Sequence, residues 1–249
     1  MSLNSAFDLL HNSIITYRGD PVGTSAACDP NPVAANYTEC FVRDFVPSAL
    51  VFLMRDQPAI VRNFLTTVMQ LRGQQPVLEG HGRSRGLMPA SFKVTRKDGE
   101  EGLEADFGER AIGRVIPVDS AMWWMFLLRA YVATTGDWDF VKGAEVQACM
   151  REILDLYLRE RFESASTLLV PDGAFMIDRR MGVYGHPLDV QVLFLGARAD
   201  MQSLESLQNP TLSFLARLAS ALAIENACSR YCRYPHPVTD KQNDVPGLG

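Results

Sequence analysis

Apolar residues recur along most of this chain at spacings of three and four, which is the spacing of one face of an α-helix. The clearest such stretch follows Asp56-Gln-Pro58, a typical helix start, and carries Ile60, Phe64 and Val68 on one face. No convincing series of alternating apolar and polar residues separates these stretches. The pattern predicts helices at residues 3–17, 46–55, 57–72, 119–135, 138–161, 187–201 and 203–230.

Two long connections interrupt the helical pattern, at residues 18–43 and 73–117, and both are rich in glycine, proline and charged residues. A third segment, residues 168–185, places polar residues and glycines between two predicted helices. Long ordered loops in a helical domain are common positions for binding residues. Helices joined by long loops, without the pattern of a parallel sheet, predict an all-α fold: an α/α toroid of helical hairpins, with a helical bundle as the alternative.

Composition and charge narrow the class of protein. The chain has 47% hydrophobic and 21% charged residues, and this composition excludes a disordered protein. Its length of 249 residues is near the upper limit for one hydrophobic core. The net charge of -5 gives no overall basic surface for nucleic acid or an anionic membrane. The longest strongly apolar stretch, residues 121–128, ends at Arg129 and is too short to span ~30 Å of hydrocarbon. We expect a soluble protein without nucleic-acid or membrane partners.

The expected compartment follows from the N-terminus and the cysteines. The first residues have neither a basic region nor a long apolar region, so no secretion signal is visible. The five cysteines are odd in number and irregularly spaced, which is typical of free thiols in a reducing environment. The sequence therefore predicts a cytoplasmic protein.

Three segments place a carboxylate beside arginine or in an apolar and aromatic setting. Burial raises the pKa of a carboxyl group and a neighbouring arginine lowers it, so such settings can tune an acid for proton transfer. The alternative is a structural aspartate that caps a helix or pairs with arginine. The candidates are Arg43 and Asp44 in Phe-Val-Arg-Asp-Phe, Asp119 before the Trp123-Trp124 pair, and Asp178 and Arg179 in Met-Ile-Asp-Arg-Arg-Met.

The aromatic residues in these segments favour a carbohydrate surface. Neutral sugars offer C–H faces for stacking and hydroxyl groups for hydrogen bonds to carboxylates and arginine. Trp123 and Trp124 are adjacent on a predicted helix and point in different directions, so at most one of them should line a pocket, and core packing is the alternative for either.

Two other motifs do not reach the standard of a binding site. The glycines of Glu79–Gly86 resemble a phosphate loop, but no strand precedes them and no helix opens at the last glycine, which favours a surface loop. Cys228, Cys232 and His236 lie at helical spacing, but Pro235 and Pro237 flank the histidine and no fourth ligand is evident. Metallopeptidase and serine-hydrolase signatures are absent as well. We expect neither a metal nor a cofactor.

Five ordered stretches resemble the alkaline/neutral invertases, glycoside hydrolase family 100. Together they extend across roughly residues 3–200, so the resemblance is specific. The stretches are Gly19–Thr24, Asn36–Met54, Gly86–Val94, Asp106–Ser120 and Leu168–Leu193.

The resemblance implies an (α/α)6 toroid that hydrolyses sucrose to glucose and fructose by an inverting mechanism with two carboxylates ~6.5–9.5 Å apart, and no metal. It implies that Asp178 is the general acid and that Arg43 and Asp44 hold the glucosyl hydroxyls. It further implies that Asp119 and Trp123 contribute to the pocket wall. Beside these, Arg179 and Asp189 are expected to contact substrate, although the family usually has glutamate where this chain has Asp189.

The chain departs from the family in length, because family members continue for roughly as many residues again. The resemblance then implies that residues 1–201 form the N-terminal part of an incomplete toroid, that residues 202–249 form a divergent helix and a frayed proline-rich tail, and that the second catalytic carboxylate is missing. Apolar helix faces would be exposed, which predicts self-association into a homo-oligomer. Two alternatives remain: a non-catalytic sugar-binding fragment, and a nucleotide-binding module based on the Gly80 loop.

Overall fold

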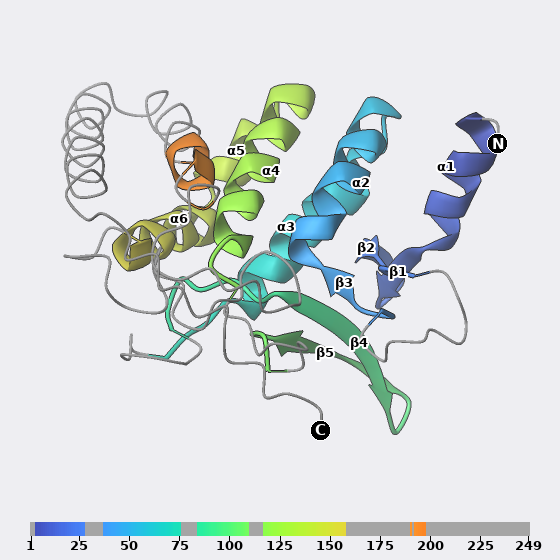
Figure 1. Ribbon diagram of the computed structural model, residues 1–249, viewed down its shortest axis with the longest axis horizontal. Helices are drawn as coiled ribbons and strands as arrows, with labels where there is room; N and C mark the ends of the chain where they lie inside the picture. The colour runs from blue at the N-terminus through green and yellow to red at the C-terminus, as the bar shows by residue number, and fades with distance from the viewer. Residues whose placement is uncertain are drawn as a thin grey trace, which may run out of the picture. The chain divides into compact units, whose positions relative to one another are not determined.

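The computed structural model describes residues 3–27, 37–75, 84–109, 117–157, 190 and 192–197 (Figure 1). The chain divides into two compact units, Met1–Leu204 and Glu205–Gly249, and all described residues belong to the first unit. The predicted helix at 203–230 and the tail after it lie outside the described residues, so the expected character of residues 202–249 stays a prediction.

Six helices carry labels in the first unit, and the two predictions at 57–72 and 119–135 are confirmed to within one residue at each end. Pro58 occupies the first turn of its helix, where its fixed φ suits the helix and its missing N–H is not needed. Gly136, with φ of 71°, ends the fourth helix in the left-handed conformation. The helices are α1 Leu3–Asn12, α2 Val42–Met54, α3 Pro58–Leu71, α4 Ser120–Thr135, α5 Trp138–Lys142 and α6 Ala144–Tyr157. Residues 192–197, within the prediction at 187–201, are also helical.

Three predicted helix boundaries were wrong. The helix predicted at 3–17 ends at Asn12, and the helix predicted at 138–161 is interrupted at Gly143, whose ψ of 136° is not helical. The first of the two pieces, α5, has its own start, because Asp137 caps it by accepting a hydrogen bond from the Phe140 amide. Helix α2 begins at Val42, four residues before the predicted start.

The prediction of an all-α chain was wrong, because two antiparallel sheets lie in the segments predicted as long connections and at the end of the first predicted helix. One is a hairpin of β1 Ile14–Tyr17 and β2 Asp20–Thr24. The other has the order β3-β4-β5, formed by Cys40–Phe41, Ser91–Lys97 and Glu100–Asp106.

Both hairpins close with two residues in the left-handed region. These are Arg18 and Gly19, with φ of 53° and 87°, and Asp98 and Gly99, with φ of 53° and 83°. Two-residue loops with positive φ at both positions match the twist of the strands they connect. The Asp98-Gly99 pair is therefore a hairpin signal within the segment predicted as a long connection at residues 73–117.

The helices alternate in direction. Arg43 in the first turn of α2 pairs with Asp119 before α4, whereas Arg62 near the start of α3 pairs with Asp137 beyond the end of α4. The starts of α2 and α4 therefore lie together, and α3 runs in the opposite direction and packs against both of them (Figure 1). At the end of α6, Tyr157 donates a hydrogen bond of 2.8 Å to the Val118 carbonyl, so α6 returns to the same level. This is the arrangement of successive helical hairpins.

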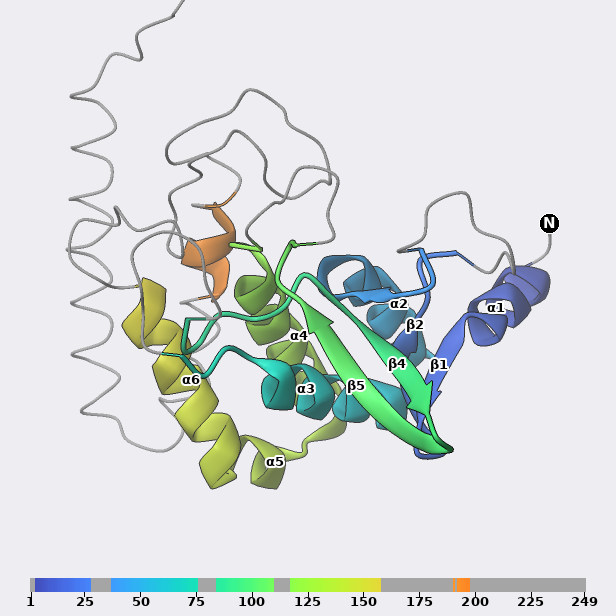
Figure 2. The same ribbon diagram turned by 90° about the horizontal axis from the view of Figure 1, so that it is seen from below.

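The sheet β3-β4-β5 lies at this common end of the helices, where β4 and β5 run across α3 (Figure 2). Phe92 of β4 contacts Phe64 of α3 at 6.2 Å between ring centroids, and Phe64 contacts Phe45 of α2 at 4.3 Å. All three rings are buried, so one aromatic cluster fixes the sheet to α2 and α3. The buried thiol of Cys40 belongs to the same core, and burial raises its pKa to about 12, which keeps it protonated.

The junction of α4 and α5 predicts an acid-dependent part of the stability. A hydrogen bond from Tyr131, supported by the Phe140 amide and Arg62, lowers the pKa of Asp137 below its ordinary value. A carboxyl whose pKa is lower in the folded than in the unfolded chain stabilises the fold above the unfolded value of ~3.9, and that contribution is lost as the pH falls through the folded value. We expect Asp137→Asn to flatten the loss of unfolding free energy below about pH 4.

Urea unfolding at a series of pH values measures this effect. The matched control is Asp139→Asn on the same short helix, because the Asp139 side chain is fully exposed. If both variants keep the wild-type dependence on pH, the contribution assigned to Asp137 is incorrect.

Candidate functional site

Three of the predicted site residues meet where α2 and α4 begin. Arg43 Nη1 donates a hydrogen bond of 3.0 Å to Asp119 Oδ2, although the two residues are 76 positions apart. Trp123 Nε1 donates to the same oxygen at 3.1 Å. The structure thus places the residues of two predicted segments in one cluster, which we call the Asp119 cluster.

Local geometry explains why Asp119 can accept both hydrogen bonds. It precedes α4, and its backbone carbonyl accepts from the amides of Met122 and Trp123, so the backbone starts the helix without a side-chain cap. The carboxylate is therefore free for other donors. Trp123 lies four residues further on the same helix, where its indole reaches back over the first turn.

The sheet positions Arg43. The Val42 amide donates to the Ala90 carbonyl, and the Ala90 amide donates to the Asp106 carbonyl, at 2.9 and 2.7 Å. These hydrogen bonds attach the first residue of α2, which directly precedes Arg43, to the ends of the strands. The guanidinium also lies 3.6 Å from the carboxylate of Asp44, measured from Nε to Oδ1.

Burial differs sharply among the charged groups of the site. The side chain of Asp119 is 4% exposed, that of Arg43 is 27% exposed and that of Asp44 is 58% exposed. A buried carboxylate is tolerated when it is paired and hydrogen-bonded, and the positive ends of two helices add to the stabilisation. The pKa of the Tyr157 phenol is raised well above its ordinary value, mainly by burial and to a smaller extent by the negative charge of Asp119. The charge of Asp119 therefore acts on Tyr157 as well.

The two adjacent tryptophans have different environments. Trp124 is fully buried and donates to the Leu65 carbonyl at 2.9 Å, so it packs in the core. Trp123 instead joins the Asp119 cluster, and its ring meets Phe126 edge-on at 6.0 Å between centroids. Phe126 is partly exposed. An aromatic face of this kind beside charged groups suits a sugar ring.

Sequence reasoning missed two buried carboxylates at the same end of the molecule. Glu39 accepts a hydrogen bond of 2.5 Å from the Ser91 hydroxyl, and Ser91 lies opposite Asp106 in the sheet. Glu39 and Asp106 are each 3% exposed. Both occur in stretches that carry the family resemblance, but the sequence predicts connections there, which does not reveal that Glu39 directly precedes β3 and that Asp106 ends β5 in the same sheet.

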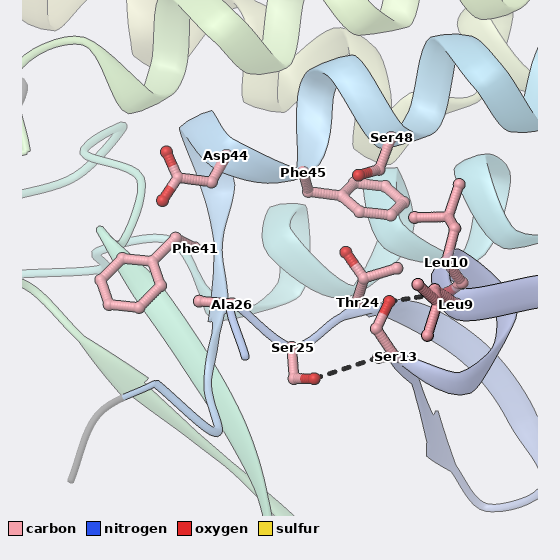
Figure 3. A pocket seen from close by; sticks show the side chains of 10 residues that line it. All are labelled: Leu9, Leu10, Ser13, Thr24, Ser25, Ala26, Phe41, Asp44, Phe45 and Ser48. Atoms are coloured by element: carbon pink, nitrogen blue, oxygen red, sulfur yellow. Dashed lines mark hydrogen bonds between the residues drawn. The ribbon is translucent and has the colours of Figure 1, made fainter. Parts of the chain in front are cut away.

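A pocket of about 500 Å³ lies beside the cluster, between the end of α1, the end of β2 and the start of α2 (Figure 3). Asp44 lines it together with Phe41 and with several hydroxyl groups, among them those of Thr24 and Ser48. A concave site with a carboxylate, hydroxyls and aromatic carbon can bind a neutral ligand that carries many hydroxyl groups. Asp44 joins this pocket to the Asp119 cluster through its contact with Arg43.

The other predicted site residues, Asp178, Arg179 and Asp189, lie outside the described residues, and their roles stay predictions. The same holds for Cys228, Cys232 and His236. Among the described residues, no group of three or more histidine, cysteine, aspartate or glutamate side chains is placed to hold a metal ion. In the same part of the chain, no helix has both the length and the apolar character needed to cross a membrane.

Comparison with known proteins gives a consistent assignment. The model of the family described as alkaline and neutral invertase matches residues 6–227. Probable alkaline/neutral invertase D of Arabidopsis thaliana is 47% identical over 220 residues, which cover 87% of this chain and 41% of that protein. Cytosolic invertase 1 of Oryza sativa subsp. japonica is 48% identical over 224 residues, which cover 88% of this chain and 40% of that protein.

A rhamnosidase from Klebsiella oxytoca is a weaker structural neighbour, with a TM-score of 0.48 and 13% identity over 74% of this chain and 31% of its own, which is too low to inform the fold. The chain spans about 40% of the length of the two curated relatives. The extent of the family match and the identity to these relatives show that the chain belongs to the alkaline and neutral invertase family.

Proposed function

We propose that this chain forms the sugar-binding part of an invertase-type glycoside hydrolase that cleaves sucrose to glucose and fructose. The observation that carries the proposal is the Asp119 cluster, which joins Arg43 and Trp123 in a chain of the invertase family. Arginine donors, a carboxylate acceptor on Asp44 and an aromatic face are together the groups that recognise a neutral sugar ring.

The fold supports a role for the helix starts in this site. In a closed (α/α)6 toroid, an inner ring of parallel helices is joined to an outer ring that runs the opposite way. The parallel starts of α2 and α4, with α3 antiparallel, fit two inner helices and one outer helix. We propose that residues 1–201 are the N-terminal part of such a toroid and that residues 202–249 are a divergent extension.

The proposed chemistry uses two carboxyl groups and no metal or cofactor. Asp178, as general acid, protonates the glycosidic oxygen as it leaves, while a second carboxylate removes a proton from the water that attacks the anomeric carbon from the opposite face. Arg179 and Asp189 would complete the contacts to substrate. We place the second carboxylate in the part of the family's length that this chain does not span.

The proposed setting is a soluble cytoplasmic protein with no nucleic-acid or membrane partner. The names of the relatives include cytosolic, chloroplastic and mitochondrial invertases, so the cytosol is one of several compartments in the family. Exposed apolar side chains on α2, such as Met54 at 85% exposure and Val51, favour burial against further protein and are consistent with a homo-oligomer.

A second candidate function is sugar binding without turnover. The observation that favours it is the share of the relatives that the chain spans, about 40%. Because the second carboxylate is placed outside this chain, the two are separated by incubating sucrose with a protein that contains this chain together with the rest of the family's length, and by measuring both released sugars. Equimolar glucose and fructose support the hydrolase, whereas saturable sucrose binding without release supports the second candidate, and neither binding nor release contradicts both.

Arg43→Ala is expected to weaken sucrose recognition. It removes charged donors, each worth about 1.5–3 kcal/mol, so the KM for sucrose or its dissociation constant should rise by about 10–100-fold. Initial rates, or calorimetry where there is no turnover, measure the change. The matched control is Arg62→Ala, which breaks another arginine–aspartate pair at the opposite ends of the helices and should leave both constants unchanged.

A further inference from the structure

Asp119 is more deeply buried than Arg43 and Trp123, the two residues that donate hydrogen bonds to it. Its carboxylate is almost completely buried, and a single oxygen accepts hydrogen bonds from side chains of two helices. We propose that Asp119 is a positioning residue, which holds the guanidinium of Arg43 and the indole of Trp123 in one arrangement for a sugar ring. This inference rests on the proposed function, and it assigns the contacts with sugar to the two donors.

The difference in burial between Asp119 and Arg43 indicates which of the two side chains can contact a ligand. Asp119 side-chain exposure is 4%, and Oδ2 already accepts at 3.0 Å from Arg43 and at 3.1 Å from Trp123. Arg43 is 27% exposed, and its guanidinium has five N–H groups, of which Nη1 faces Asp119. Other N–H groups of the Arg43 guanidinium therefore remain available to a ligand while Nη1 donates to Asp119.

The indole of Trp123 is fixed at two points. Its N–H is bonded to Asp119, and its ring meets Phe126 with an interplanar angle of 86°. Loss of the Asp119 carboxylate would remove the polar restraint and leave the side chain to exchange among rotamers. A sugar would then have to order the ring on binding, and preorganised groups bind more tightly because that cost is absent.

Equilibrium binding of sucrose to the 249-residue chain tests the proposal. Asp119→Ala should raise the dissociation constant by about 10–100-fold, because both donors lose a charged acceptor. Asp119→Asn should have a smaller effect, since its amide oxygen still accepts from Trp123 without the charge that attracts Arg43. Asp139→Ala, at a fully exposed aspartate, is the control and should bind as the wild type does.

A cycle of variants distinguishes positioning from a direct contact. If Asp119 acts through its two partners, Asp119→Ala should add little to the loss already caused by Arg43→Ala combined with Trp123→Phe. An additional loss of the same factor that Asp119→Ala causes alone would overturn the proposal, because it would indicate an independent role.

The indole N–H resonances give a readout that needs no sugar. The Trp123 signal, identified by its absence in Trp123→Phe, should shift and exchange faster with solvent in Asp119→Ala, whereas the Trp124 signal, bonded to the Leu65 carbonyl, should stay and report an intact core. An unchanged Trp123 signal, or wild-type affinity in Asp119→Ala, would overturn the positioning role alone. If the wild-type chain binds no sucrose, the proposed function fails and this inference with it. Should Asp119→Ala not fold, Asp119→Asn carries the binding comparison and the variant cycle but not the indole readout, and wild-type affinity in Asp119→Asn would then overturn the proposal.

Discussion

Replacing Asp178 by asparagine is expected to lower kcat for sucrose hydrolysis by about 10²–10⁴-fold in a protein that contains this chain, because the amide cannot supply the proton that the leaving oxygen needs. The effect on KM should be small, since asparagine keeps the size and most of the hydrogen bonds of the side chain. Initial rates at saturating sucrose measure the loss.

Asp155→Asn is the matched control, because Asp155 is an exposed aspartate on α6 and should turn over at the wild-type rate. Proton NMR of the first glucose released adds a test of stereochemistry: an inverting mechanism converts the α-glucosyl bond of sucrose into β-glucose. Near-normal turnover in Asp178→Asn would remove the general-acid assignment, and α-glucose as the first product would remove inversion.

Gly86→Ala is expected to cause a large loss of stability. Gly86 has φ of 87°, and a Cβ at this position would lie 2.3 Å from the backbone oxygen of Glu152. The left-handed conformation costs an alanine ~1–2 kcal/mol, and displacing a packed backbone adds ~1–3 kcal/mol. The free energy of unfolding, measured with urea, should therefore fall by about 2–5 kcal/mol.

Gly99→Ala separates the two causes of that loss. Gly99 has φ of 83°, close to that of Gly86, but nothing lies within 4 Å of a Cβ built there. Its variant should lose only the conformational cost of ~1–2 kcal/mol. Equal losses in the two variants would show that the loop at Gly86 does not press against α6.

The strongly periodic helices could be predicted from sequence. Helices α3 and α4 bury continuous faces, and local signals mark their ends, Pro58 at the start of one and Gly136 after the other. The start of α2 was harder to predict, because the helix follows the two-residue strand β3 directly, with no loop between Phe41 and Val42. That boundary depends on pairing with β4, which is remote in the sequence.

The strands were missed for identifiable reasons. Strand β4 alternates only at Phe92 and Val94 before it ends in Thr-Arg-Lys, which is too short a run to predict a strand, and β5 contains three glutamates and a glycine, which rarely favour strands. Cross-strand pairing and packing on α3 stabilise this hairpin, and these are tertiary contacts. The Asp98-Gly99 turn was the available local signal.

The site was foreseen as separate residues and not as a geometry. The residue patterns and the resemblance both led to Arg43, Asp119 and Trp123, but no local pattern could show that one carboxylate oxygen joins the other two. The same applies to Glu39 and Ser91, which are 52 positions apart and meet only because the strands pair.

Calorimetric titration of sucrose into the wild-type 249-residue chain tests whether the Asp119 cluster belongs to a sugar-binding site. We expect saturable binding that survives in Arg62→Ala and weakens by at least about 10-fold in Arg43→Ala. No saturable binding by the wild type, or equal affinity in the two arginine variants, would contradict it.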